Sequence, residues 1–169
     1  MKKIITLFIM ILSTVSYSQT SITDTNINDA VNTCLSTNPV DGLCSDSEYG
    51  PITDWDVSSV TNMQYLFILQ ESFNGDISSW DVSSVTTMDS MFNFLSTFNQ
   101  DISSWDVSSV TNMRYMFRTT GSFNGDISSW DVSNVTNMEY MFYVALAFNQ
   151  DIDSWDVSNV TDMDQMFYG

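Results

Sequence analysis

The sequence contains no histidine and has only four basic side chains against 21 acidic ones among its 169 residues. Without histidine it lacks the usual general base and the commonest metal ligand. The shortage of positive charge repels nucleic acid and anionic membrane surfaces, so neither is expected as a partner. The acidity does not indicate disorder, because aromatic and aliphatic residues are abundant and periodic.

Apolar runs long enough to cross a membrane, roughly 20 residues, are also missing. The longest run, residues 4–12, follows Lys2 and Lys3 and precedes the small residues 16–18, which is the pattern of a secretory signal peptide. We predict a cleaved signal peptide at residues 1–18, a secreted or cell-surface location and no membrane insertion after cleavage. The remaining chain keeps two arginines against 21 acidic residues, a net charge of −19.

Cysteine is scarce too. The two cysteines, Cys34 and Cys44, most simply form one disulfide in an oxidising, extracellular setting. A metal site needs more ligands than this pair supplies, and a redox-active pair is the remaining alternative. Around Cys34, apolar residues recur at helical spacing, and Asp24 is a candidate helix N-cap. We therefore predict that residues 19–50 form an N-terminal helical cap held by the disulfide.

One repeated unit makes up the rest of the chain. The five tryptophans recur at one constant interval without a gap, and each is followed by Asp-Val-Ser. Valine, methionine and phenylalanine repeat downstream with the same period. The tryptophans are Trp55, Trp80, Trp105, Trp130 and Trp155. Such ungapped repetition predicts five tandem repeats over residues 51–169, the last of them incomplete.

The pattern within each unit predicts a short strand followed by a short helix. In the third unit the apolar Trp105 and Val107 alternate with Asp106 and Ser108, as in a half-buried strand. A Met-x-x-Met-Phe motif follows, with the spacing of about two helical turns. Stacked units would bury a continuous core and align their strands about 4.8 Å apart. We therefore predict an α/β solenoid, a leucine-rich-repeat-like stack of 25-residue strand-helix coils with parallel strands on one face and an N-terminal helical cap.

The segment FNQDISSWDVSSVTNM, residues 98–113, resembles the short repeat of BspA-like bacterial surface proteins. The segment YGPITDW, residues 49–55, resembles the usual start of that array. The resemblance covers residues 21–169 and implies a leucine-rich-repeat-like fold and a surface or extracellular location. It implies little about activity, since the family's role is mostly unassigned, with adhesion proposed for some members. It supplies no catalytic residues.

The regular exposed chemistry of the predicted strand face is a column of aspartates, a candidate cation or ligand face. Its members are Asp56, Asp81, Asp106, Asp131 and Asp156. Carboxylates stacked about 5 Å apart repel by roughly 1 kcal/mol in water and should attract cations, and their hard oxygen ligands suit Ca²⁺. The alternative is that serine hydroxyls, backbone N–H groups and counter-ions hold the column. Neither a Gly-rich nonapeptide Ca²⁺ loop nor an EF-hand loop is present, so we expect no cofactor, with Ca²⁺ as the alternative.

The repeats vary in one place. Residues 68–72, 93–97, 118–122 and 143–147 differ freely, whereas the Trp-Asp-Val-Ser segment is nearly invariant. A uniform Asp/Ser face suits a repetitive ligand, ions or a structural constraint better than a diverse protein epitope. The tyrosines beside the variable stretches are interpreted as packing residues or as contacts for glycans or proteins. They are Tyr65, Tyr115 and Tyr140.

These features predict a non-catalytic secreted or cell-surface protein that acts in adhesion or binding, with an extracellular protein or glycan as partner. One alternative is a structural spacer in a longer surface protein, and the array is expected to be part of something longer. The other is a carbohydrate-active solenoid enzyme with paired carboxylates. The enzyme is disfavoured because every acid recurs in each repeat, which leaves no singular site.

Overall fold

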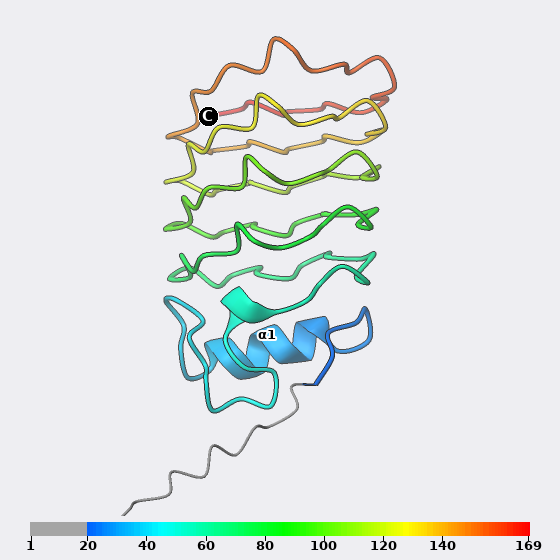
Figure 1. Cartoon of the computed structure of the whole chain (residues 1–169). Coiled ribbons are helices and arrows are strands. Elements are labelled where there is room, and N and C mark those ends of the chain that lie inside the picture. The colour runs from blue at the N-terminus through cyan, green and yellow to red at the C-terminus, as the bar shows by residue number, and fades with distance from the viewer. Residues whose placement is uncertain (1–19) are drawn as a thin grey trace, which may run out of the picture.

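The computed structural model describes residues 20–169, so the predicted signal peptide at residues 1–18 lies outside the described residues. An N-terminal cap is followed by a stack of coils that run one above another (Figure 1). The cap contains the α-helix α1, Ile27–Leu35, and the first coil begins with the 3-10 helix η1, Ile52–Asp54. No helix in the described part is long and apolar enough to cross a membrane.

The predicted α/β solenoid of leucine-rich-repeat-like strand-helix coils is wrong. Within residues 20–169 the structure has one α-helix, which lies in the cap, and no strand or sheet. Successive coils are linked instead by isolated parallel bridges, which join Asn62 to Thr87, Thr87 to Asn112, Asn112 to Asn137, and Asn137 to Asp162. Each coil is therefore built from turns.

The segment predicted to be helical is a run of overlapping β-turns. The N–H of Met116 donates to the carbonyl of Met113 (3.2 Å), and the N–H of Arg118 donates to that of Tyr115 (3.1 Å). The alternate N–H groups donate to the next coil instead, as the N–H of Tyr115 does to the carbonyl of Glu139 (2.9 Å). The helix was predicted because consecutive turns, like an α-helix, put residues three and four apart on one side.

The segment predicted to be a strand forms turns as well. We name residues 55–60 and their equivalents in the other repeats the Trp/Asp segment. In the third coil the N–H of Trp105 donates to Ile102 (3.2 Å) and that of Val110 to Val107 (2.9 Å). Among the described residues no backbone hydrogen bond joins one Trp/Asp segment to the next. The short apolar-polar alternation marks which side chains are buried but does not require a strand.

The core consists of columns of identical side chains. Equivalent phenylalanine rings such as Phe92 and Phe117 are stacked with centroids 5.4–5.8 Å apart. The Trp indoles are buried, and from the second coil on each Nε1–H donates to an isoleucine carbonyl of the coil before it, at 3.0–3.2 Å. Each tryptophan thus removes apolar area from water while its polar atom stays satisfied.

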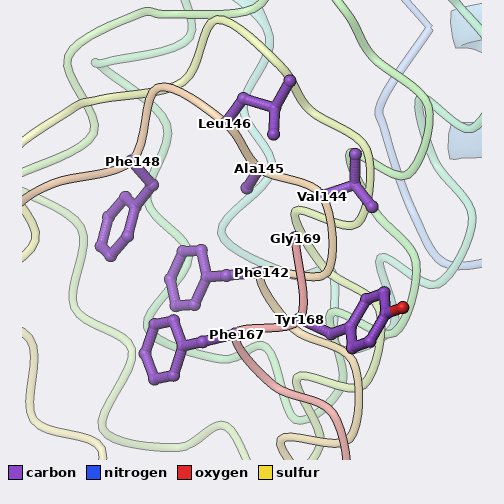
Figure 2. Close-up of a pocket in the computed structure, with 8 residues that line it drawn as sticks. All are labelled: Phe142, Val144, Ala145, Leu146, Phe148, Phe167, Tyr168 and Gly169. Carbon is purple, nitrogen blue, oxygen red and sulfur yellow. The ribbon is translucent and has the colours of Figure 1, made fainter.

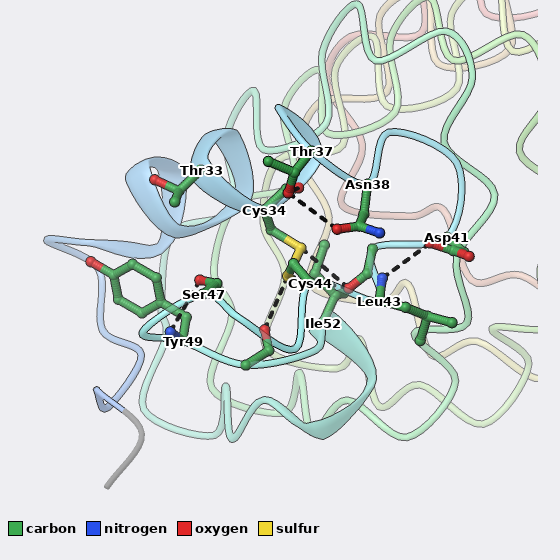
Figure 3. The surroundings of a disulfide bond; sticks show 12 residues. Thr33, Cys34, Thr37, Asn38, Asp41, Leu43, Cys44, Ser47, Tyr49 and Ile52 are labelled. Carbon is green, nitrogen blue, oxygen red and sulfur yellow. Dashed lines mark hydrogen bonds between the residues drawn. A yellow bond between two sulfur atoms is a disulfide. The ribbon is translucent and has the colours of Figure 1, made fainter. Parts of the chain in front are cut away.

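The cap is held to its own loop by a disulfide. Cys34, in α1, is bonded to Cys44, with Cα atoms 5.3 Å apart, and both side chains are buried (Figure 3). The bond closes the chain between α1 and the loop that leads to η1. Closing this short loop stabilises the fold by about 3 kcal/mol in the chain-entropy description.

Asp24 has a different role from the predicted helix N-cap. The residue before α1 is Asn26, which makes no side-chain cap hydrogen bond. The Asp24 carboxylate instead accepts the N–H and the hydroxyl of Thr61, both at 2.7 Å, and the N–H of Asn62 at 3.1 Å. In later coils the equivalent donors of Thr86 meet the carbonyl of Thr61.

The Asp24 side chain therefore replaces the carbonyl that a preceding coil would offer, and so covers the first edge of the stack. Desolvation opposes its ionisation, but the hydrogen bonds from Thr61 and Asn62 bring the pKa of Asp24 below its ordinary value. An acidic side chain is suited to this place because a charged acceptor holds three donors better than a neutral one.

Candidate functional site

The predicted aspartate column lies on the outside of the Trp/Asp segments. Each of its carboxylates accepts the N–H of the serine two residues later, at 3.0–3.1 Å. In the first three coils the same serine also donates its hydroxyl at 2.6 Å. These are Asx-type turns, in which a side chain satisfies its own backbone.

Local hydrogen bonds lower the pKa of four of these carboxylates. The hydroxyl and then the N–H of Ser83 hold the pKa of Asp81 below its ordinary value. The serines two residues on lower the pKa values of Asp56 and Asp131 in the same way, and the N–H and then the hydroxyl of Ser158 lower that of Asp156. The predicted aspartates thus lie in a regular row along the stack, which we call the aspartate row. Each of them is hydrogen-bonded to a serine of its own coil.

A metal centre is not assembled by this row. Within residues 20–169 no group of three or more His, Cys, Asp or Glu side chains is arranged to hold a metal ion. A Ca²⁺ ion would have to draw its ligands from different coils and compete with each serine. The candidate cation face therefore carries negative charge, but its carboxylates are not arranged as the ligands of one ion.

The last coil shows an apolar hollow of about 220 Å³, in which Phe142, Phe148 and Phe167 lie side by side (Figure 2). Phe142 is stacked on Phe117 below it and on Phe167 above it, at 5.5 Å in both cases. The hollow is therefore the continuation of the core columns at the last coil. Among the side chains that line it, only the Tyr168 phenol is ionisable.

A second surface carries polar and aromatic side chains that differ from one repeat to the next. We name it the Tyr/Arg face: positions 64, 65, 68 and 69 and their equivalents in the other repeats. On it lies an open hollow of about 460 Å³ between coils two and five. The hollow is lined by Asn93, Tyr115, Arg118, Tyr140, Tyr143 and Gln165.

The tyrosines of this face pack against one another, and two of them, Tyr115 and Tyr140, accept hydrogen bonds at their hydroxyls. Tyr140 lies 5.1 Å from Tyr115 and 5.3 Å from Tyr143, between ring centroids, and both pairs are tilted. The Tyr140 hydroxyl accepts the side-chain amide of Gln165 at 2.7 Å. Desolvation, and after it the charge of Asp164, raises the pKa of Tyr140, so this phenol stays protonated at neutral pH.

Both arginines of the chain lie on this face, in different surroundings. Arg114 is paired with Glu139, which raises the pKa of the guanidinium. Arg118 forms no ion pair with any described residue. Its guanidinium carbon lies over three rings, 4.8 Å from that of Phe94, 5.3 Å from that of Tyr143 and 5.7 Å from that of Tyr115.

The backbone of the Tyr/Arg face is unusual. In the described chain nine non-glycine residues have φ between +49° and +62°, and all nine lie at two positions of this face. They are Tyr65, Ser90, Tyr115, Tyr140 and Gln165 at one position, and Leu69, Phe94, Thr119 and Val144 at the other. The left-handed conformation costs a side chain about 1–2 kcal/mol. Here it turns alternate N–H groups toward the next coil.

Sequence reasoning identified Tyr115 and Tyr140 on this face but missed Asn93, Arg118, Tyr143 and Gln165. The available signal was the variation among the repeats. When the repeats are aligned with one another, Asn93, Arg118 and Tyr143 fall in one column, and the column contains one of the two arginines.

Comparison with known proteins gives a family without an assigned activity. A family model described as "Mycoplasma protein of unknown function, DUF285" matches residues 41–143 and 104–169, which together cover most of the chain. No curated protein and no solved structure matches significantly. The match identifies a repeat-type family but not the BspA-like leucine-rich-repeat relationship.

Proposed function

We propose that this chain, which belongs to the DUF285 family of repeat proteins, is a non-catalytic secreted or cell-surface binding protein that contacts its partner through the Tyr/Arg face. We further propose that it is a BspA-like short-repeat surface protein. The N-terminal signal pattern and the Cys34–Cys44 disulfide support the extracellular location.

The observation that carries the binding function is the concentration of partly exposed tyrosine and arginine on the one face that varies between coils. Tyrosine and arginine are enriched where proteins bind partners, because they combine broad apolar contact with directed hydrogen bonds. The Trp/Asp segment offers the opposite, a uniform row of carboxylates engaged by their own serines. A non-catalytic role is supported by the lack of histidine and by the repetition of every aspartate of that row.

The test is a binding screen of the secreted protein against arrays of glycans and extracellular-matrix proteins. A double variant of the Tyr/Arg face, Tyr115→Ser with Tyr143→Ser, should lose at least tenfold in affinity for whatever ligand is found. The matched control removes two exposed carboxylates of the other surface, Asp106→Ser with Asp131→Ser, and should bind as the unaltered protein does. Location is tested by antibody labelling of intact cells and of the culture medium.

Two results would overturn the proposal. One is the absence of binding on both arrays. The other is binding that the Trp/Asp control loses and the Tyr/Arg variant keeps, because the contact surface would then be the aspartate row.

A further inference from the structure

We propose that the hollow between Asn93, Arg118 and Tyr143 binds a carboxylate-bearing sugar of an acidic glycan. This inference rests on the proposed binding function and names the ligand class for the same face. Four features of the hollow carry it: an arginine without an acid partner, a buried amide without a hydrogen bond, a set of tilted tyrosine rings, and backbone N–H groups at Tyr115 and Thr119 that are already bonded to the next coil.

Arg118 is the anion-recognising group. The chain has 21 acidic residues, yet none forms an ion pair with Arg118 among the described residues. Its side chain makes no hydrogen bond to them either, and it is positioned only by the rings of Phe94, Tyr115 and Tyr143. Stacking on rings leaves the N–H groups at the edge of the guanidinium free, and their fork matches the two oxygens of a carboxylate.

Asn93 points independently to a ligand. The residue is only 6% exposed, and its Oδ1 is the one buried side-chain polar atom of the described chain that lacks a hydrogen-bond partner. Leaving such an atom unsatisfied costs about 1–3 kcal/mol. Because Asn93 lines the same hollow as Arg118, a rotation about its last bond offers the amide to a ligand hydroxyl.

The tyrosine rings provide an aromatic surface on which the face of a sugar ring can pack. The rings of Tyr115, Tyr140 and Tyr143 meet at tilts of 35° and 56° and form a curved wall. A sugar ring has apolar C–H faces and a polar rim, so it is complementary to a wall of amphipathic rings with amides at its border. Gln165 uses its N–H on the Tyr140 hydroxyl, which leaves its own carbonyl oxygen as an acceptor.

The backbone around the hollow disfavours an extended acidic peptide. Peptides that add to a protein as a strand need unpaired N–H and C=O groups along an edge. Here the N–H of Tyr115 donates to Glu139 (2.9 Å) and that of Thr119 to Tyr143 (2.7 Å). Around Arg118, recognition must therefore come from side chains, which suits a compact ligand with hydroxyls of its own.

The size and the number of sites follow from the same residues. About 460 Å³ lies within the usual range of small-ligand pockets, although the hollow is open. The positions equivalent to Arg118 hold Ile68, Asn93, Tyr143 and Tyr168, so the chain provides one such site. A single open site implies weak binding of one sugar, with a Kd of about 1 mM.

The experiment is a titration of the secreted protein, followed by NMR and calorimetry, with methyl glucuronide, methyl galacturonide and a methyl sialoside. Methyl glucoside and methyl galactoside are the neutral counterparts. At least one acidic sugar should bind at least tenfold more tightly than the neutral sugars. Arg118→Gln should abolish that preference, whereas the control Asp106→Asn, which changes the charge by one unit on the Trp/Asp segment, should change it less than threefold because Asp106 lies outside the hollow.

Asn93→Leu separates binding from folding. Removing a buried unsatisfied amide should leave the melting temperature unchanged or raise it. The affinity for the acidic sugar should nevertheless fall severalfold, an effect that a purely structural role for Asn93 would not produce. Near-ultraviolet circular dichroism of each variant establishes that it is folded.

The inference is overturned if acidic and neutral sugars bind equally, if none of the acidic sugars binds, or if Arg118→Gln retains the preference. It is also overturned if a glutamate-rich peptide binds through Arg118 and the sugars do not. Should the acidic sugars fail while the array screen still finds a partner that depends on the Tyr/Arg face, only the ligand class is wrong. Should both fail, the proposed function falls as well.

Discussion

The Trp/Asp segment and the Tyr/Arg face join one coil to the next in opposite ways. In the Trp/Asp segment the backbone is satisfied locally, and side chains reach the neighbouring coil, as when the Trp105 indole donates to Ile77 at 3.2 Å. On the Tyr/Arg face the backbone itself reaches across, as from Tyr115 to Glu139. Where side chains form the hydrogen bonds between coils, the same side chain must recur in every repeat. Where the backbone forms these bonds, the side chains are free to differ. This contrast explains why one surface is uniform and the other varies.

The largest loss of stability should come from removing a side chain that is hydrogen-bonded to the neighbouring coil. Trp105→Ala leaves a cavity in the core and the Ile77 carbonyl without its donor, and should lower the free energy of unfolding by about 3–5 kcal/mol. Tyr143→Ala, on the variable face, should lower it by about 1 kcal/mol. Urea unfolding monitored by circular dichroism measures both. Equal losses would remove the distinction between the two surfaces.

A smaller effect should come from the backbone of the Tyr/Arg face. Thr119 is β-branched at φ +58°, a conformation that asparagine tolerates better. Thr119→Asn should therefore raise the free energy of unfolding by about 1 kcal/mol. The control Ser122→Asn, at an exposed residue outside the left-handed set, should change it by less than about 0.5 kcal/mol. A loss of stability in Thr119→Asn alone would show that this backbone is not strained.

On the Trp/Asp segment the pKa of Asp81 should report its local turn. NMR titration of the side-chain carboxyl should give a pKa below the ordinary 3.8, and Ser83→Ala should move it back toward that value. Because the folded pKa is the lower one, this carboxylate stabilises the fold above the ordinary pKa, and the contribution is lost as the pH falls through the folded pKa. Ser84→Ala, which leaves the hydrogen bonds of Asp81 intact, should not shift it.

The smallest effect is expected from Ca²⁺. Each aspartate of the row is engaged by its own serine, so melting temperatures in excess Ca²⁺ and in EDTA should agree. A site saturated at a hundredfold excess of ligand would instead add about 2.7 kcal/mol, or several degrees. Such a rise would show that the aspartate row binds cations and would move the functional surface to the Trp/Asp segment.

Part of the site could have been predicted from the sequence. The ungapped period of the repeats places Asn93, Arg118 and Tyr143 in one column, and Tyr115 was identified as a candidate contact. The unsatisfied oxygen of Asn93 and the acid-free surroundings of Arg118 could not be predicted, because both depend on which side chains of other coils come within reach.

By itself the sequence determined the period, the columns of buried tryptophan and phenylalanine and the acidic charge. It also showed that the cysteines could pair and that the variable residues recur at one place in each unit. Only the tertiary structure decided how the backbone is hydrogen-bonded, and here the predicted strand and helix were both wrong. Apolar spacing reports which side chains face the core, and helices and successive turns share that spacing. The N–H of Tyr115 uses a carbonyl of the next coil instead of one four residues back, because stacking brings that carbonyl to 2.9 Å.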